Sequence, residues 1–316
     1  MFGIISRPYN YSQFTRDQVT REILRRAFDR APKPGERAPD FTVRSLTGDS
    51  IRLSDYRGRK NVVLTFGSAT CPMTAGSIGG MNDLFDRYGD DDVEFFFVYV
   101  REAHPGDEIP AHESMAEKVC AAEILQEQEN VEMPILVDDL RGTVHRKYGS
   151  LPNPAFLVDK SGRIAFRSQW VQAGAIEEAL RQLLKIQHER GLDHAVVLGG
   201  EDRSLPVSYP VLYSYRALHR GGRQAILDFE TAMGLPGKML VASSRIAGPV
   251  VEKVVENPGK IVATAALGVG VVAAAIFAGR ALRRRRMSPR NPYDRYVFET
   301  PDAKDRGTTD YPAVGI

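Results

Sequence analysis

The 316-residue sequence predicts an α/β domain, with a mostly parallel β-sheet covered by helices, followed by a single transmembrane helix. Continuous apolar runs such as "NVVLTF" (61–66) and "VEFFFVYV" (93–100) are typical of strands buried on both faces. Stretches with helical periodicity separate these runs, and this alternation favours parallel strands joined by crossover helices. A third observation, 19 consecutive uncharged residues at 261–279, predicts the transmembrane helix, because about 20 apolar residues span a bilayer.

The α/β domain is expected to span residues 36–190, after a polar arm at 1–35 that contains one helix at Arg16–Asp29. Ser114 followed by Glu117 has the spacing of a capping box and predicts the start of a helix within the domain. The other strands are expected at 133–138, 155–159 and 164–170, the last two joined as a hairpin, and the helices at 75–88, 114–128 and 176–188.

Beyond this domain we expect a less regular connecting segment (191–258), the transmembrane helix (259–282) and a polar, disordered tail (283–316). Lys260 precedes the apolar run and a cluster of arginines follows it, as at many membrane anchors; the alternative is an apolar core helix. The N-terminus lacks the apolar stretch of a signal peptide, which favours a single-pass protein with its α/β domain in the cytoplasm. The arginines by themselves favour a cytoplasmic C-terminus instead.

Composition narrows the class of protein. Forty-two Lys and Arg against 40 Asp and Glu leave a net charge of +2, so no global positive field indicates a nucleic-acid partner. The chain has two cysteines, Cys71 and Cys120, which do not make a disulfide framework. This usage fits a reducing compartment or an exported enzyme with catalytic thiols. No bound cofactor or metal ion is expected.

Cys71, in "TFGSATCPMT" (65–74), is the candidate nucleophile because it falls between a buried strand and the start of a helix. The first turn of a helix offers free N–H groups and a partial positive charge that stabilise a thiolate, and Pro72 is compatible with the first helical position. The hydroxyls of Ser68 and Thr70 can donate hydrogen bonds to a thiolate or to a bound substrate. The alternative is a structural thiol, since free cysteine is among the most buried residue types.

The segment 35–66 resembles the opening of the thioredoxin-like redoxins, and Cys71 takes the place of their attacking cysteine. This resemblance implies a thioredoxin-like three-layer sandwich, in which helices flank a central mixed sheet. Two subtypes match less well. Thr74 stands where thioredoxins have a second cysteine, and Leu64 stands where peroxiredoxins have a proline, although Ser68 matches their hydroxyl residue.

"FGSATCP" followed by "EAHPGDEIPAH" resembles the iodothyronine deiodinases, which carry selenocysteine in a similar context. The resemblance covers about residues 35–185 and implies that Cys71 occupies the selenocysteine position. It also implies that five residues take the positions of supporting active-site groups: Ser68, Thr70, Glu102, His104 and His112. Pro154 stands where the family has an arginine, so we take the resemblance to imply the fold, the thiol and the redox class, and not the hormone substrate.

The position of the candidate residues favours the same site. The strand at 93–100 should run parallel to the strand at 61–66, so Glu102 and His104 should emerge at the same sheet edge as Cys71. A histidine there could form an ion pair with the thiolate or deliver a proton. The alternatives are an ordinary loop residue for His104 and, for His112, a solvent-facing position before a helix.

Cys120 and two prolines are further candidates. Cys120 falls near the border of a helical apolar stripe, where it could resolve an intermediate at Cys71 or serve as a structural thiol. Pro152 and Pro154 precede the late strand, where thioredoxin-like folds place a cis-proline beside the nucleophile, and the sequence does not distinguish between them.

The sequence therefore predicts a membrane-tethered thiol-dependent oxidoreductase with a deiodinase-like redoxin site. The alternatives are a peroxiredoxin-like peroxidase and a non-catalytic redoxin fold that serves as an interaction module at the membrane. The expected reductant is an external thiol, such as a thioredoxin or a small thiol, and the expected substrate is a small molecule or a protein thiol. Residues 259–282 are the expected contact with the membrane, and no nucleic-acid partner is expected.

Overall fold

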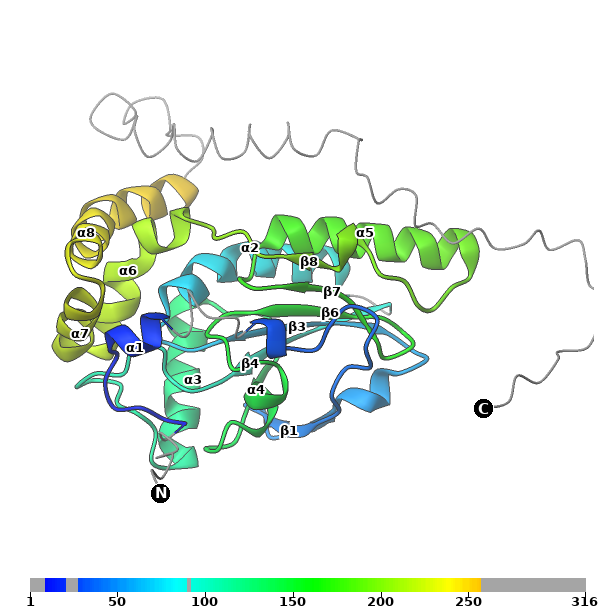
Figure 1. Cartoon of the computed structure of the whole chain (residues 1–316), viewed down its shortest axis with the longest axis horizontal. Coiled ribbons are helices and arrows are strands. Elements are labelled where there is room, and N and C mark those ends of the chain that lie inside the picture. Colours follow the sequence, from blue (N-terminus) through cyan, green and yellow to red (C-terminus); the bar gives the residue numbers. More distant parts are fainter. Residues whose placement is uncertain (1–8, 21–27, 90–91, 257–316) are drawn as a thin grey trace, which may run out of the picture. The chain divides into compact units, whose positions relative to one another are not determined.

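A single mixed β-sheet organises the part of the chain that the structure, a computed structural model, describes: residues 9–20, 28–89 and 92–256 (Figure 1). The order of the strands across the sheet is β2-β1-β5-β4-β3-β6-β7-β8. These strands are β1 (Thr42–Ser45), β2 (Ser50–Arg52), β3 (Asn61–Gly67), β4 (Val93–Tyr99), β5 (Ile135–Val137), β6 (Ala155–Val158), β7 (Ile164–Ser168) and β8 (Glu201–Asp202).

Parallel pairs occupy the centre of this sheet. β3 pairs with β4 in parallel, and β4 pairs in parallel with β5. Gly67, at the end of β3, lies opposite Tyr99, at the end of β4, so the carboxyl ends of the two central strands meet at one edge. On the other side β3 pairs with β6 in an antiparallel direction, and β6 forms the predicted hairpin with β7.

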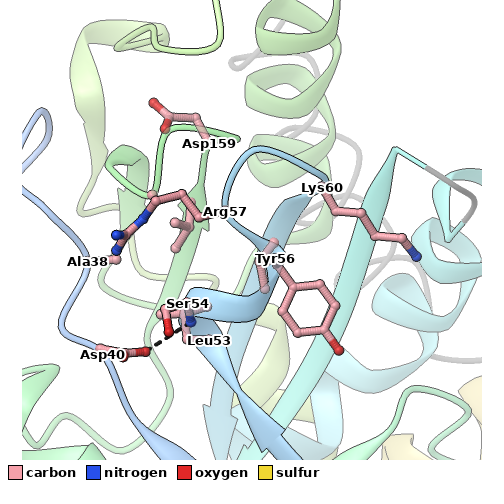
Figure 2. A pocket seen from close by; sticks show the side chains of 11 residues that line it. Ala38, Asp40, Leu53, Ser54, Tyr56, Arg57, Lys60 and Asp159 are labelled. Atoms are coloured by element: carbon pink, nitrogen blue, oxygen red, sulfur yellow. Dashed lines mark hydrogen bonds between the residues drawn. The ribbon is translucent and has the colours of Figure 1, made fainter.

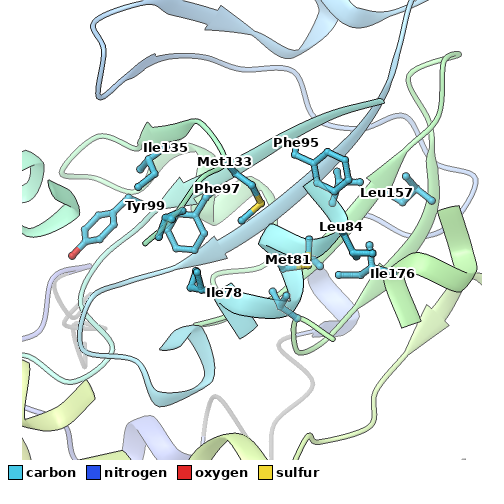
Figure 3. Packing of buried hydrophobic residues seen from close by; sticks show 14 of the residues in the cluster. Ile78, Met81, Leu84, Phe95, Phe97, Tyr99, Met133, Ile135, Leu157 and Ile176 are labelled. Atoms are coloured by element: carbon cyan, nitrogen blue, oxygen red, sulfur yellow. The ribbon is translucent and has the colours of Figure 1, made fainter. Parts of the chain in front are cut away.

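The two faces of the sheet bury two separate apolar clusters, because successive side chains of a strand point to opposite faces. In β4, Phe95, Phe97 and Tyr99 belong to one cluster, while Phe96 and Val98 belong to the other. The first cluster packs against long helices (Figure 3). These helices are α2 (Pro72–Tyr88), α3 (Met115–Glu129) and α5 (Ala173–Arg190).

The second face carries a thinner cover than the predicted layer of helices. Its cluster includes Phe28 from the 3₁₀ turn η2 (Phe28–Arg30), Leu53 from the 3₁₀ turn η3 (Leu53–Tyr56) and Tyr148, which follows the short helix α4 (Thr143–Lys147). The mixed α/β, thioredoxin-like arrangement is thus present, but with one face covered by long helices and the other by short turns and loops.

Residues 191–256 differ most from the expectation, because they contain helices where an irregular connection was predicted. These helices are α6 (Ser208–Gly221), α7 (Arg223–Met233) and α8 (Leu235–Glu256). Gly222 and Gly234 have positive φ angles of 98° and 66° and separate the helices. These two glycines therefore mark the ends of helices and do not indicate irregular structure.

The N-terminal arm packs against this helical layer. Phe14, next to α1 (Arg16–Val19), forms a buried cluster with Leu218, Phe229 and Val241 of α6, α7 and α8. The helix expected over Arg16–Asp29 is described only in part, since residues 21–27 lie outside the described ranges.

The predicted transmembrane helix (259–282) and the predicted disordered tail (283–316) also lie outside the described residues. Among the residues that are described, no helix combines the length and the apolar character that crossing a membrane requires.

Candidate active site

Cys71 lies where the sequence predicts it, between β3 and α2. It is the N-cap residue of α2, and Pro72 occupies the first helical position. The N–H of Cys71 donates a 3.3 Å hydrogen bond to the carbonyl of Ser68, and the carbonyl of Cys71 accepts a 3.1 Å bond from the N–H of Ala75. The sulfur is therefore held at the positive end of a 17-residue helix, at the carboxyl edge of the sheet.

The Cys71 side chain is buried, with only 2% of its surface exposed. It packs in a small cluster with Met73, Ala103 and Trp170, and the ring of Tyr209 from α6 lies against this cluster. Tyr209 also packs closely on α2: a Cβ added at Gly76 would lie 2.5 Å from the tyrosine ring. The thiol is thus covered by a residue from the helical layer that the sequence analysis expected to be irregular.

Glu102 is the centre of a buried hydrogen-bond network directly behind the Cys71 loop. One of its carboxylate oxygens, Oε2, accepts hydrogen bonds from the N–H of Thr70 (2.9 Å) and from its hydroxyl (2.6 Å). The other oxygen, Oε1, accepts the hydroxyl of Tyr99 and lies 3.1 Å from Nε2 of His112. Burial raises the pKa of Glu102, but the hydrogen bonds from His112, Thr70 and Tyr99 outweigh this effect and lower the pKa below its ordinary value.

The hydroxyls of Ser68 and Thr70 fix the loops around the thiol. Ser68 Oγ accepts the N–H of Ala103 at 3.1 Å, and Thr70 Oγ1 accepts the N–H of His104 at 3.0 Å. Thr70 donates its own hydroxyl proton to Glu102, and not to the thiol as the sequence analysis allowed. Both hydroxyls therefore connect the loop before Cys71 to the loop that follows β4.

His104 lies in an aromatic environment that keeps its imidazole neutral. The ring contacts Phe14 at a centroid distance of 4.2 Å and Phe229 at 5.2 Å, both edge-to-face. Its Nδ1 is buried and has no hydrogen-bond partner. Burial lowers the pKa of His104 to about 3, so the predicted ion pair between an imidazolium and the thiolate is not supported at neutral pH.

His104 should make the folded state sensitive to acid. Its imidazole has a pKa of about 3 in the folded protein and an ordinary value of 6.5 in the unfolded chain. Between these two values the unfolded chain binds one more proton, so stability falls as pH falls, by about 1.4 kcal/mol per pH unit for this group. We expect His104→Phe to reduce the slope of unfolding free energy against pH by about this amount between pH 6 and 4, measured by urea denaturation. An unchanged slope would contradict the assignment.

His145 is a second buried histidine whose pKa is lowered, mainly by burial, and it supplies a control for that measurement. Its Nδ1 shares a 2.7 Å hydrogen bond with the hydroxyl of Tyr9, and its Nε2 lies 2.6 Å from the carbonyl oxygen of Leu151. The acid sensitivity that remains in His104→Phe should therefore disappear in part when His145 is also replaced.

Of the other predicted site residues, His112 belongs to the Glu102 network, whereas Cys120 and the two prolines do not. His112 is buried beside Glu102 and belongs to the network, so it does not face solvent. Cys120 is exposed on α3 and forms no disulfide with Cys71. All peptide bonds of the described residues are trans, so neither Pro152 nor Pro154 supplies the cis-proline that the resemblance suggested.

Asn153 occupies the place between these two prolines and holds the late loop against the site. The side chain is fully buried; its Nδ2 donates to the carbonyl of Phe66 at 3.0 Å, and its Oδ1 accepts the N–H of Val171 at 3.2 Å. Asn153 was not among the site residues predicted from the sequence. A buried amide that pairs with backbone groups leaves no distinct sequence signal.

Arg220 of α6 also contacts the Cys71 loop and was not predicted from the sequence. Its Nη1 donates a 2.5 Å hydrogen bond to the carbonyl of Ala69, two residues before the thiol. Its guanidinium also pairs with Glu129 and donates to Gln128 at the end of α3. Arg220 is itself 8% exposed, so this buried ion pair connects the helical layer to the loop that carries Cys71.

Arg220 also lines a cavity of about 930 Å³ between α3, the loop at 107–109 and helices α6 to α8. A second hollow, lined by Asp40, Ser54 and Tyr56 among others, lies near the amino end of β3, away from Cys71 (Figure 2). Its volume of about 10 Å³ holds at most one water molecule. In the described ranges no three His, Cys, Asp or Glu residues are grouped as metal ligands.

Comparisons with known proteins indicate the family to which the chain belongs. Residues 10–188 match the model of the iodothyronine deiodinase family. The chain is 29% identical over 144 residues to the type I iodothyronine deiodinase of Xenopus laevis, covering 43% of this chain and 56% of the relative. It is 32% identical over 123 residues to the thyroxine 5-deiodinase of Ovis aries, covering 36% and 41%. The chain thus spans about half the length of these deiodinases.

A thiol-disulfide oxidoreductase, ResA of Bacillus cereus, is 29% identical over 152 residues, covering 48% of this chain and 76% of the relative. Among solved structures, the exposed lipoprotein thioredoxin of Streptococcus pneumoniae is 25% identical, with a TM-score of 0.35, and covers 46% of this chain and all of that one. The family match includes β3, Cys71, the Glu102 network and His112, and it covers more than half of the sequence. The chain belongs to the iodothyronine deiodinase family.

Proposed function

We propose that the protein is a thiol-dependent oxidoreductase in which the sulfur of Cys71 is the nucleophile. The observation that carries this proposal is the place of Cys71 as N-cap of α2, at the carboxyl edge of the parallel strands β3 and β4. The positive potential of the helix N-terminus favours the thiolate over the thiol. Family membership and the relative that is named a thiol-disulfide oxidoreductase support the same class of reaction.

In the proposed reaction the Cys71 thiolate attacks an electrophilic sulfur, oxygen or iodine atom of the substrate. The bond from that atom to the rest of the substrate breaks, and the leaving group takes the electron pair and a proton. An external thiol then attacks the adduct at Cys71, and a second thiol releases the Cys71 thiolate. Two thiols are oxidised to one disulfide for each substrate molecule reduced.

The buried network supports this reaction by positioning the nucleophile. Glu102 is ionised and fixes the backbone of Thr70, the residue that precedes Cys71. Arg220 fixes the carbonyl of Ala69 from the other side. Because a thiol with 2% exposure cannot be reached directly, a substrate must displace part of the cover formed by Trp170 and Tyr209.

The reductant in this proposal is a thioredoxin or a small thiol, and the substrate is a small molecule or a protein thiol in its oxidised, disulfide form. One relative is named a deiodinase, which is consistent with attack on iodine, and another is named a thiol-disulfide oxidoreductase, which is consistent with attack on sulfur. We also propose that residues 259–282 tether the domain to a membrane, with the domain on the cytoplasmic side. The 19 uncharged, mostly apolar residues at 261–279 and the arginines after them support the tether.

The pH dependence of Cys71 alkylation tests the proposal. An unperturbed cysteine thiol has a pKa of about 8.5. In the Cys120→Ser variant, the rate at which iodoacetamide modifies Cys71 should therefore reach half of its maximum at a pH below about 8.5. The Cys71→Ser variant measures labelling that does not involve Cys71. A midpoint at or above about 8.5 would mean that the helix N-terminus does not activate the thiol, and the proposal would fail.

A further inference from the structure

Helix α8 exposes a continuous apolar stripe to solvent. Leu235, Met239 and Ile246 are 70%, 63% and 76% exposed, and Ala242 between them is also exposed. Intervals of four, three and four residues place all four side chains on one narrow face of a helix, since a turn takes 3.6 residues. At about 1.5 Å per residue, the stripe is about 16 Å long.

The opposite face of α8 is packed against α6 and α7 and fixes the direction in which the stripe points (Figure 1). Small residues make the closest contacts. The Oγ of Ser244 accepts the N–H of Tyr215 at 2.7 Å, and a Cβ added at Gly248 would lie 2.9 Å from the carbonyl oxygen of Leu212. Val241 packs inward together with these small residues, whereas Leu235, Met239 and Ile246 point outward. Burial within the described part of the chain therefore does not explain the stripe.

The charges beside the stripe match an anionic lipid surface. Lys238 and Arg245 are exposed, and both lie on the same side of the stripe by helical spacing. The sequence 235–251 contains no acidic residue. A helix with a narrow apolar face and flanking basic residues is typical of helices that lie in the interface of a membrane.

The chain that follows α8 favours a membrane over a second protein molecule. The 19 uncharged residues at 261–279 begin five residues after α8 ends at Glu256. A stable protein–protein interface has about 20 to 30 residues on each side, whereas the stripe has four. An interfacial helix needs only a shallow apolar face.

We propose that α8 docks on the surface of a membrane, with Leu235, Met239 and Ile246 in the boundary between headgroups and acyl chains and with Lys238 and Arg245 at anionic headgroups. The inference rests on the proposed tether and adds an orientation to it. Because α8 packs on α6 and Tyr209 of α6 covers the Cys71 cluster, docking places the covered thiol two helices away from the lipid.

Fluorescence quenching by brominated lipid tests this orientation in the full chain. The chain has one tryptophan, Trp170, which is 5% exposed and supplies a constant background. Met239→Trp adds a reporter to the stripe, and Arg44→Trp adds a control reporter at an exposed position of β1. Both variants are reconstituted in vesicles of phosphatidylcholine and phosphatidylglycerol, in which the phosphatidylcholine carries bromine at a shallow acyl position.

We expect the reporter at position 239 to be quenched several times more strongly than the reporter at position 44. Flotation of the same vesicles reports the tether separately. If the chain floats with the vesicles and position 239 is quenched no more than position 44, the docking proposal is wrong and the tether stands. If the chain does not float, both are wrong. Loss of a dimer in detergent when Leu235, Met239 and Ile246 are replaced by glutamate would assign the stripe to a second copy and overturn the proposal.

Discussion

Replacement of Cys71 by serine should lower thiol-dependent turnover by on the order of 10³-fold or more, because a hydroxyl is a much weaker nucleophile than a thiolate at neutral pH. The substitution exchanges sulfur for oxygen in a side chain that packs with Met73, Ala103 and Trp170, so the fold should be retained. The measurement is product formation with dithiothreitol as the reductant, with an aryl iodide and a small disulfide tested as substrates.

The matched control for this experiment is Cys120→Ser. Cys120 is exposed on α3 and outside the Glu102 network, so the variant should keep most of the activity if an external thiol regenerates Cys71. If the Cys71→Ser variant remains active while Cys120→Ser is inactive, Cys120 is the nucleophile and the assignment to Cys71 is wrong. Loss of multiple turnover alone in Cys120→Ser, with the first turnover intact, would identify Cys120 as the resolving thiol.

Replacement of Glu102 by alanine should lower the free energy of unfolding by about 3–5 kcal/mol. The carboxylate accepts two hydrogen bonds from Thr70 and one from Tyr99 in the buried interior, and it pairs with His112. The variant leaves these donors without an acceptor, and a buried donor without a partner costs about 1–3 kcal/mol. Urea denaturation at neutral pH measures the loss.

Two variants make the Glu102 result specific. Glu102→Gln keeps the volume and one acceptor oxygen, so its loss should be smaller than that of Glu102→Ala. Glu123→Ala removes an exposed carboxylate from α3 and should change stability by no more than about 0.5 kcal/mol. The pKa of Glu102 lies below its ordinary value of 4.5, so its stabilising effect is present above that pH and is lost as the pH falls further. Equal losses in the two carboxylate-to-alanine variants would contradict the network.

Local sequence patterns were sufficient to predict the strands and helix starts that position the candidate site. The apolar runs of β3 and β4 are buried on both faces and run in parallel, so their carboxyl ends place Cys71 and Glu102 at one edge. Pro72 marks the first turn of α2, and Ser114 accepts the N–H of Glu117 as a capping box requires. These features depend on residues that are neighbours in the sequence, which is why periodicity and spacing could predict them.

The environment of each site residue depends on distant parts of the chain and could not be predicted in this way. His104 is neutral because Phe14 of the N-terminal arm and Phe229 of α7 exclude water from it. Arg220 and Tyr209 reach the Cys71 loop from α6, beyond the segment that resembles the deiodinases. Tyr99 had a weak signal, since it carries a hydroxyl at the carboxyl end of an otherwise apolar strand.

Residues 191–256 contain three helices where a less regular connection was predicted, and glycines occupy key positions among them. Gly222 and Gly234 adopt positive φ angles between helices, and Gly248 permits the close contact of α8 with α6. The same residue type therefore ends α6 and α7 and allows α8 to pack closely on α6. Composition alone does not separate these uses of glycine from a flexible segment.

Mass spectrometry of the protein after a stoichiometric oxidant tests the central claim, nucleophilic attack by Cys71, most directly. The reduced full chain is treated with one equivalent of a small disulfide or of hydrogen peroxide, and the modified peptide is identified. The account predicts a mixed disulfide or a sulfenic acid at Cys71 ahead of any change at the exposed Cys120. Modification of Cys120 alone, with Cys71 unchanged in the folded protein, would contradict it.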